Sequence, residues 1–183
     1  MPIPDSGNFA ALGYSLESGI PYTIGMIRNH YVGRTFIQPA QAIRDLKVKV
    51  KFNPLRDVVR GKRLIVVDDS IVRGTTSKAR IQSLREAGAK AIHMRVSCPP
   101  IKHPCFYGID FPTRKELIAN THTLEDTRKF LGVETLGYLS LEGMQQAVRG
   151  GQESYCTACW SGKYPVEFGG EGDKLALERK CSG

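Results

Sequence analysis

The chain has 183 residues, of which 41% are hydrophobic and 24% charged, so it should fold around one buried core and is not a disordered chain. No run of about 18 apolar residues and no signal peptide are visible, so we expect a cytoplasmic protein without a membrane partner. The formal net charge is +8, but the basic residues form no dense block and are not interleaved with aromatic residues. This pattern favours a polyanionic small substrate over nucleic acid.

The first predicted element is a helix over residues 9–17, which follows turn-forming residues and ends at Gly19. A polar turn of this kind normally follows a strand, and we expect that first strand to be missing here. A strand is predicted over residues 22–27. Residues 28–60 are basic and have little periodicity, apart from a short helix near residues 39–46. A stretch of this length usually forms a functional loop or is disordered.

Residues 63–67 form a short apolar run rich in β-branched side chains, which predicts a buried strand. A helix to about residue 87 and a strand over residues 91–97 follow, so we expect a βαβ unit with parallel strands. Later elements are two helices opened by capping-box patterns, at Thr113 with Glu116 and at Thr123 with Asp126, and a helix over residues 140–148. We therefore divide the chain into an α/β domain, residues 1–149, and a tail, residues 150–183.

The most informative segment covers residues 64–77. Its strand ends with two carboxylates, Asp68 and Asp69, at the edge of an open α/β sheet where ligands bind. Gly74, Thr75 and Thr76 then open a helix, whose first N–H groups and hydroxyl groups suit a phosphate. Together these groups suit a phosphorylated sugar and a magnesium ion held by oxygen atoms. The alternative is that the paired aspartates only cap the helix and interact with water.

Residues 66–77 resemble the phosphoribosylpyrophosphate motif of type I phosphoribosyltransferases, and residues 68–77 resemble, more narrowly, the amidophosphoribosyltransferase family. Further segments agree with the second resemblance: residues 4–7, 28–36, 99–101 with 105–110, and 136–140. The resemblance extends in order over nearly the whole chain to Lys163. It implies an α/β protein with the type I phosphoribosyltransferase fold, in which helices flank a mainly parallel sheet.

The resemblance also implies which residues form the site. Magnesium would be held by Ser6, Asp68 and Asp69. The residues that would bind phosphoribosylpyrophosphate are consecutive: Asp68, Asp69, Ser70, Ile71, Val72, Arg73, Gly74, Thr75 and Thr76.

The family's flexible loop would correspond to residues 28–51, and Arg28, Arg34 and Lys51 would be catalytic residues that engage the pyrophosphate. The implied reaction is displacement at C1 of the ribose, where pyrophosphate leaves and ammonia attacks from the opposite face. No protein nucleophile is needed, because positioning and electrostatic stabilisation supply the acceleration. The product, 5-phosphoribosylamine, begins purine nucleotide synthesis.

In the family the ammonia comes from a glutaminase domain, and no such domain is recognisable in this sequence. We therefore expect either a fragment of a longer, homo-oligomeric enzyme or a chain that works with a separate glutaminase. Two other functions stay open. A salvage phosphoribosyltransferase would share residues 68–76 but not residues 28–36 or the cysteines. A non-enzymatic regulator would bind phosphoribosylpyrophosphate without turnover.

Five cysteines are present, and an odd number without a secretory signal argues against a disulfide framework. Cys156 and Cys159 form a Cys-x-x-Cys pair, which is typical of a metal site, an iron–sulfur cluster or a redox pair. One subclass of the family carries a [4Fe–4S] cluster, and Cys105, Cys156 and Cys159 match three of its four ligands. The fourth lies further upstream in the family, so Cys98 and Cys181 are candidates to replace it. A zinc site is the rival.

Overall fold

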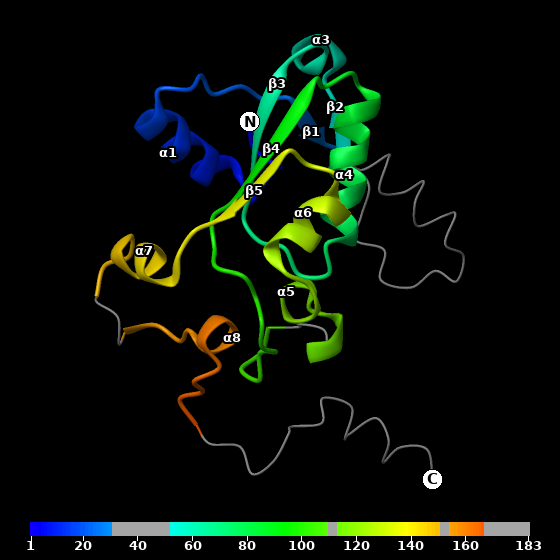
Figure 1. Cartoon of the computed structure of the whole chain (residues 1–183). Coiled ribbons are helices and arrows are strands. Elements are labelled where there is room, and N and C mark those ends of the chain that lie inside the picture. The colour runs from blue at the N-terminus through cyan, green and yellow to red at the C-terminus, as the bar shows by residue number, and fades with distance from the viewer. Residues whose placement is uncertain (31–51, 110–112, 151–153, 167–183) are drawn as a thin grey trace.

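The structure is a computed structural model of the chain, and it describes residues 1–30, 52–109, 113–150 and 154–166. Figure 1 shows a central sheet with α1 (Asn8–Ser18) on one side and α4 (Thr75–Glu86) and α6 (Leu124–Leu131) on the other. Among the described residues, no helix is long and apolar enough to cross a lipid bilayer. The predictions for residues 31–51, which include Arg34 and Lys51, fall outside the described parts, as does the prediction for Cys181.

Three parallel strands form the central sheet in the order β3–β4–β5. The strands and the first crossover helix are β3 (Arg63–Asp68), α4 (Thr75–Glu86), β4 (Ala91–Val96) and β5 (Thr135–Tyr138). The predicted βαβ unit is therefore confirmed. Arg63 pairs with Ala91 and Asp68 pairs with Val96, so the carboxyl ends of β3 and β4 reach the same edge of the sheet. That edge is where open α/β sheets bind ligands.

A short segment at the start of the chain lies along the free edge of β3. Pro2 forms a parallel bridge with Val67. The N–H of Ile3 donates to the Val67 carbonyl at 2.8 Å, and the Val67 N–H donates to the Met1 carbonyl at 2.9 Å. We expected the strand before Ser6 to be missing, and the described residues contain no full strand there. The bridge nevertheless fixes the backbone that leads into Ser6 against β3.

A second, smaller sheet lies beside the first. Its elements and the helix that follows are β1 (Met26–Arg28), β2 (Phe52–Pro54) and α3 (Arg56–Val59). β1 and β2 are antiparallel, and Arg28 pairs with Phe52, so the two ends of the predicted loop meet in this sheet. The strand predicted over residues 22–27 is shifted, because pairing begins only at Met26.

Some helix ends coincide with capping signals in the sequence. Gly19 ends the first helix in the left-handed conformation, with a φ of 69°. The Thr123 hydroxyl accepts the N–H of Asp126 at 3.1 Å, as the predicted capping box requires. The pattern at Thr113 and Glu116 opens a 3-10 helix of three residues. The remaining helices are α1 (Asn8–Ser18), η1 (Arg114–Glu116), α5 (Ile118–Thr121), α6 (Leu124–Leu131), α7 (Leu141–Gln146) and α8 (Ala158–Ser161).

The core lies between the sheet and α4. Side chains alternate along a strand, so Val66, Ile92 and Met94 share one face of the sheet, where their exposures are 0%, 0% and 1%. Ile81 and Leu84 on the inner face of α4 are 2% and 0% exposed. Burial of each such side chain contributes about 1.5–3 kcal/mol to stability. This layer therefore holds β3 and α4, and with them the loop between the two elements, in fixed relative positions.

Candidate active site

The predicted carboxylate pair lies where β3 ends, but its two members have different surroundings. Asp68 is 1% exposed. Its Oδ1 accepts a hydrogen bond from the N–H of Asp69 at 3.1 Å, and its Oδ2 accepts one from Nη1 of Arg80 at 3.2 Å. Asp69 is half-buried, and its carboxylate accepts hydroxyl groups from Ser6 at 2.8 Å and Ser70 at 3.0 Å. Asp69 and Ser6 therefore face the solvent, whereas Asp68 lies behind them.

These surroundings shift the acidities of the two carboxyl groups in opposite directions. Burial raises the pKa of Asp68 to about 7, although the nearby Arg80 guanidinium acts to lower it. Burial also acts to raise the pKa of Asp69, but hydrogen bonds from Asp68 and from two serine hydroxyl groups outweigh it, and the pKa falls below its ordinary value. Of the two neighbouring groups, Asp68 therefore holds a proton more readily than Asp69.

Ser6 reaches Asp69 because the turn that contains it packs directly against β3. A Cβ atom at Gly7 would lie 2.5 Å from the carbonyl oxygen of Val67 and 2.7 Å from that of Ile3. Side-chain carbons do not approach oxygen atoms so closely, so glycine is needed for this packing. The Ser6 hydroxyl is thereby held at the carboxyl end of β3, beside the carboxylates.

The loop after the carboxylates leads into the N-terminus of α4. Gly74 precedes the helix with a φ of 77°, in the left-handed region that favours glycine. α4 is 12 residues long, and the N–H groups of an α-helix's first turn have no partners within the helix. Thr75 and Thr76 are exposed on this turn. The start of α4 therefore has the chemistry that a phosphate group needs.

Three contacts anchor this loop. Ile71 is 1% exposed and belongs to the core. The carbonyl of Val72 accepts the N–H of Ile118 at 2.9 Å. Nη2 of Arg73 lies 2.9 Å from Oε1 of Glu116, the last residue of the 3-10 helix over Arg114–Glu116. These contacts connect the loop to the core and to residues 116–118.

Arg28, which we predicted to engage pyrophosphate, lies on β1 near the same edge. Its Nη1 is 2.6 Å from Oδ2 of Asp5, and Nε2 of His30 is 3.9 Å from Oδ1 of the same carboxylate. The side chains of Arg28 and Asp5 are 30% and 45% exposed, so an anionic ligand has access to this guanidinium. Asp5 belongs to the turn that contains Ser6, and the ion pair therefore connects β1 to that turn.

The three predicted cluster ligands lie around α8. Burial raises the pKa of Cys159 to about 11, and the thiols of Cys105 and Cys156 act through space in the same direction. The N–H groups of Lys102 and His103 both donate to the Cys159 carbonyl at 3.0 Å, which connects the tail to the loop after β4. The described residues nevertheless contain no group of three His, Cys, Asp or Glu side chains that could hold a metal ion. The iron–sulfur cluster stays a prediction.

The sequence analysis did not single out two residues of this site. Asp5 pairs with Arg28 across 23 positions of sequence. Arg80 lies 12 positions after Asp68 and outside the motif, and no spacing rule assigns it a role. The one signal for Arg80 was its position on the face of α4 that packs toward β3, which brings its side chain to Asp68.

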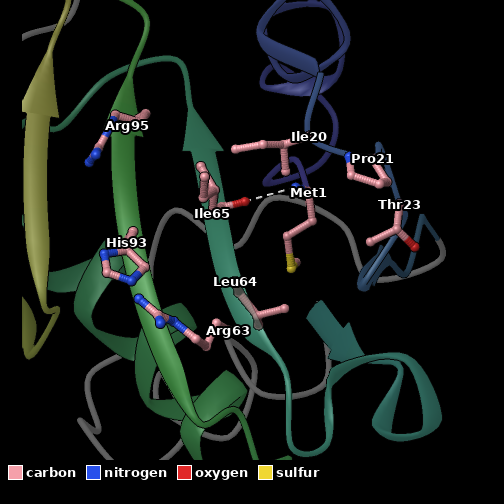
Figure 2. Close-up of a pocket in the computed structure, with 9 residues that line it drawn as sticks. All are labelled: Met1, Ile20, Pro21, Thr23, Arg63, Leu64, Ile65, His93 and Arg95. Atoms are coloured by element: carbon pink, nitrogen blue, oxygen red, sulfur yellow. Dashed lines mark hydrogen bonds between the residues drawn. The ribbon is translucent and has the colours of Figure 1, made fainter. Parts of the chain in front are cut away.

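A cavity of about 400 Å³ lies away from the carboxylates. Figure 2 shows its walls, which are Met1, Ile20, Pro21, Thr23, Arg63, Leu64, Ile65, His93 and Arg95. Nδ1 of His93 and Nη1 of Arg95 each lie 3.0 Å from the Thr135 hydroxyl, which holds both side chains along the sheet. None of the residues that we predicted to contact the substrate lines this cavity. We therefore place the site at the end of β3.

Curated relatives agree with the resemblance in the sequence. The chain is 56% identical over 171 residues to the amidophosphoribosyltransferase of Mycobacterium tuberculosis, and the match covers 91% of this chain and 32% of that protein. It is 50% identical over 182 residues to the amidophosphoribosyltransferase of Methanothermobacter thermautotrophicus, covering 100% of this chain and 38% of that protein. No protein-family profile matches. The chain thus spans about a third of the length of these relatives, in their C-terminal portion.

Solved structures give the same result for the fold. Glutamine phosphoribosylpyrophosphate amidotransferase from B. subtilis, complexed with ADP and GMP, matches with a TM-score of 0.80 and 52% identity, covering 91% of this chain and 37% of that chain. A structure described as the allosteric regulatory enzyme of purine biosynthesis gives the same values. The expected phosphoribosyltransferase fold is therefore confirmed.

Proposed function

Over the portion that it covers, the chain belongs to the amidophosphoribosyltransferase family, and from this we propose that it transfers nitrogen from ammonia to C1 of 5-phosphoribosyl 1-pyrophosphate. The products are pyrophosphate and 5-phosphoribosylamine, at the start of purine nucleotide synthesis. One observation carries the proposal. The oxygen cluster of Ser6, Asp69 and Ser70 lies directly before the loop that opens α4. A phosphorylated sugar needs hydroxyl acceptors and a phosphate site side by side, whereas a bare phosphate needs no carboxylate.

Each part of the substrate has a matching group. The 5′-phosphate would accept hydrogen bonds from the first N–H groups of α4 and from the hydroxyls of Thr75 and Thr76. The ribose hydroxyl groups would donate to Asp69, whose lowered pKa keeps it an acceptor. The pyrophosphate would pair with Arg28, which is accessible beside the same turn.

The reaction then needs no covalent intermediate with the protein. The bond between C1 and the pyrophosphate oxygen breaks, and its electron pair leaves with the pyrophosphate. The ammonia nitrogen forms the new bond to C1 and releases a proton to the solvent. The chain's contribution is to fix the ribose and to stabilise the negative charge that develops on the leaving group, for which Arg28 is positioned.

Magnesium fits the donor atoms of this site. Magnesium prefers oxygen ligands and keeps several waters, so it binds through few protein groups together with substrate phosphates. Of the three predicted ligands, Ser6 and Asp69 offer accessible oxygen atoms, whereas the oxygen atoms of Asp68 are buried and bonded to Arg80 and the Asp69 N–H. When bound, the ion would neutralise part of the pyrophosphate charge.

We also propose that Cys105, Cys156 and Cys159 ligate an iron–sulfur cluster in the full-length protein. The support is that their thiols are near enough to interact electrostatically, and thiolates suit iron–sulfur clusters and zinc alike. Visible absorption, with iron, acid-labile sulfide and zinc analysis of the purified protein, decides between the two metals. Protein free of all three would contradict the proposal.

The source of ammonia and the assembly are further proposals. Relatives are about three times as long as the matched portion, so we propose that a glutaminase outside this chain supplies the ammonia and that the longer protein is a homo-oligomer in the cytoplasm. Light scattering of the longer protein and its turnover with glutamine would check the two points.

The test of the main proposal follows pyrophosphate release from 5-phosphoribosyl 1-pyrophosphate with magnesium, first with ammonia and then with glutamine as nitrogen donor. The double variant Asp68→Asn, Asp69→Asn is the control. We expect turnover with ammonia that the double variant lacks. Binding of the substrate without turnover would favour a regulator, and turnover with a nucleobase in place of ammonia would favour a salvage enzyme. A folded chain that does not bind the substrate refutes all three.

A further inference from the structure

Arg80 lies outside the motif that marks the site, yet its side chain reaches the centre of it. Nη1 of Arg80 lies 3.2 Å from Oδ2 of Asp68, and the two side chains are 17% and 1% exposed. Arg80 belongs to α4, the element that follows β3 in the chain, whereas Asp68 is the last residue of β3. A charged contact with so little exposure is held in one geometry, unlike a surface ion pair.

An aromatic ring fixes the other side of the guanidinium. The Arg80 guanidinium carbon lies 4.4 Å from the centre of the Phe52 ring. Phe52 is itself 7% exposed and belongs to β2. A planar guanidinium can stack on a ring and donate to a carboxylate at the same time, which the compact ammonium group of lysine does less well. Nε of Arg80 is buried and has no hydrogen-bond partner among the described residues, so the ring and Asp68 set its orientation.

The contact determines what Asp68 can do. One of its oxygens accepts a hydrogen bond from the Arg80 guanidinium, and the other accepts a hydrogen bond from the backbone N–H of Asp69 at 3.1 Å. Asp68 is thus occupied on both sides and turned away from solvent. Asp69, in contrast, directs its carboxylate toward the hydroxyls of Ser6 and Ser70.

We propose that Arg80 is a positioning residue for substrate binding: it holds Asp68, and Asp68 in turn holds the backbone turn that presents Asp69 to the ribose and magnesium. The two neighbouring aspartates then have unequal roles, and Phe52 on β2 supports the arrangement. This inference rests on the proposed function. Without Arg80, Oδ2 of the buried Asp68 carboxylate loses its ion-pair partner, and the side chain is held less firmly in one orientation.

The experiment compares Arg80→Met with Arg85→Met. Arg85 is on the same helix, but it pairs with Glu134 at 2.7 Å and lies outside the site. Binding of 5-phosphoribosyl 1-pyrophosphate with magnesium, and of inorganic phosphate alone, is followed by amide NMR titration. Phosphate reports on the start of α4, and the pyrophosphorylated sugar reports on Asp69 as well. The amide signal of Asp69 without ligand is the third readout.

We expect Arg80→Met to weaken binding of the sugar substrate about tenfold, to leave the phosphate affinity within about twofold and to shift the Asp69 amide signal. Arg85→Met should lower stability without changing these three readouts. Should Arg80→Met fail to fold, Phe52→Leu, which keeps apolar packing but removes the ring face, should weaken sugar binding in the same direction.

Two results overturn the inference while leaving the proposed function intact. In one, the variant binds the sugar substrate as tightly as the unchanged chain. In the other, sugar and phosphate affinities fall together, as they would from lost positive charge or general disruption. If the unchanged chain does not bind 5-phosphoribosyl 1-pyrophosphate at all, the proposed function itself is wrong and the inference falls with it.

Discussion

Gly74 joins the loop after β3 to α4 and allows a specific test of how tightly this junction is packed. Its φ is 77°, and a Cβ atom there would lie 2.8 Å from Cδ1 of Ile118 and 3.1 Å from Cε1 of Phe130. Gly61 has a similar φ of 71°, but a Cβ atom there would meet nothing within 4 Å. Alanine at Gly61 therefore measures the backbone term alone, and alanine at Gly74 measures the backbone and packing terms together.

The magnitudes follow from these two terms. Placing a residue with a Cβ in the left-handed region costs about 1–2 kcal/mol, which should apply to both variants. Ile118 is 4% exposed and belongs to the core, so its displaced tip must move into filled space. Overpacking of this kind costs about 1–3 kcal/mol. We expect Gly61→Ala to lower the free energy of unfolding by about 1–2 kcal/mol and Gly74→Ala by about 2–5 kcal/mol.

Equilibrium urea unfolding, followed by circular dichroism, measures both changes under the same conditions. The informative quantity is the difference between the two variants, because the shared backbone term cancels. If the two losses agree within about 0.5 kcal/mol, Ile118 and Phe130 yield without penalty, and the packing argument for this loop is refuted.

Other predictions concern the supports of the fold. Glu134→Gln should lower the free energy of unfolding by about 1 kcal/mol at pH 7, because it removes the ion pair between this half-exposed carboxylate and Arg85. The pKa of Glu134 is lowered in the folded state, because its hydrogen bonds outweigh the effect of burial. The loss of stability should therefore be full above the ordinary pKa of glutamate and should vanish as the pH falls through the folded-state pKa. A loss that does not change with pH in urea unfolding would contradict this. Thr123→Ala removes the hydroxyl that accepts the Asp126 N–H and caps α6, and it should lower the free energy of unfolding by about 1 kcal/mol. An unchanged unfolding midpoint would contradict this. Leu84→Ala, at a fully buried position, should lower the free energy of unfolding by about 2–5 kcal/mol, and a loss below 1 kcal/mol would mean that the core closes around the space.

Much of the fold could be predicted because the signals are local. The β-branched run before Asp68 and the helix after it predicted a βαβ unit, which the parallel pairing of β3 and β4 confirms. The capping pattern at Thr123 opens α6 as expected. The strand over residues 22–27 was placed too early, because strand pairing depends on a partner, and the partner, β2, lies far along the chain.

The chemical character of the candidate site could be predicted from the sequence, since its groups fall within nine consecutive residues: two carboxylates, a glycine and two threonines between a strand and a helix. How these groups differ from one another becomes visible only in the folded chain. Asp68 and Asp69 are identical neighbours in the sequence, but Asp68 is buried against Arg80, whose guanidinium lies over the Phe52 ring, and Asp69 faces Ser6. The burial and hydrogen-bond partners of a side chain depend on segments that are distant in sequence and meet only when the chain folds.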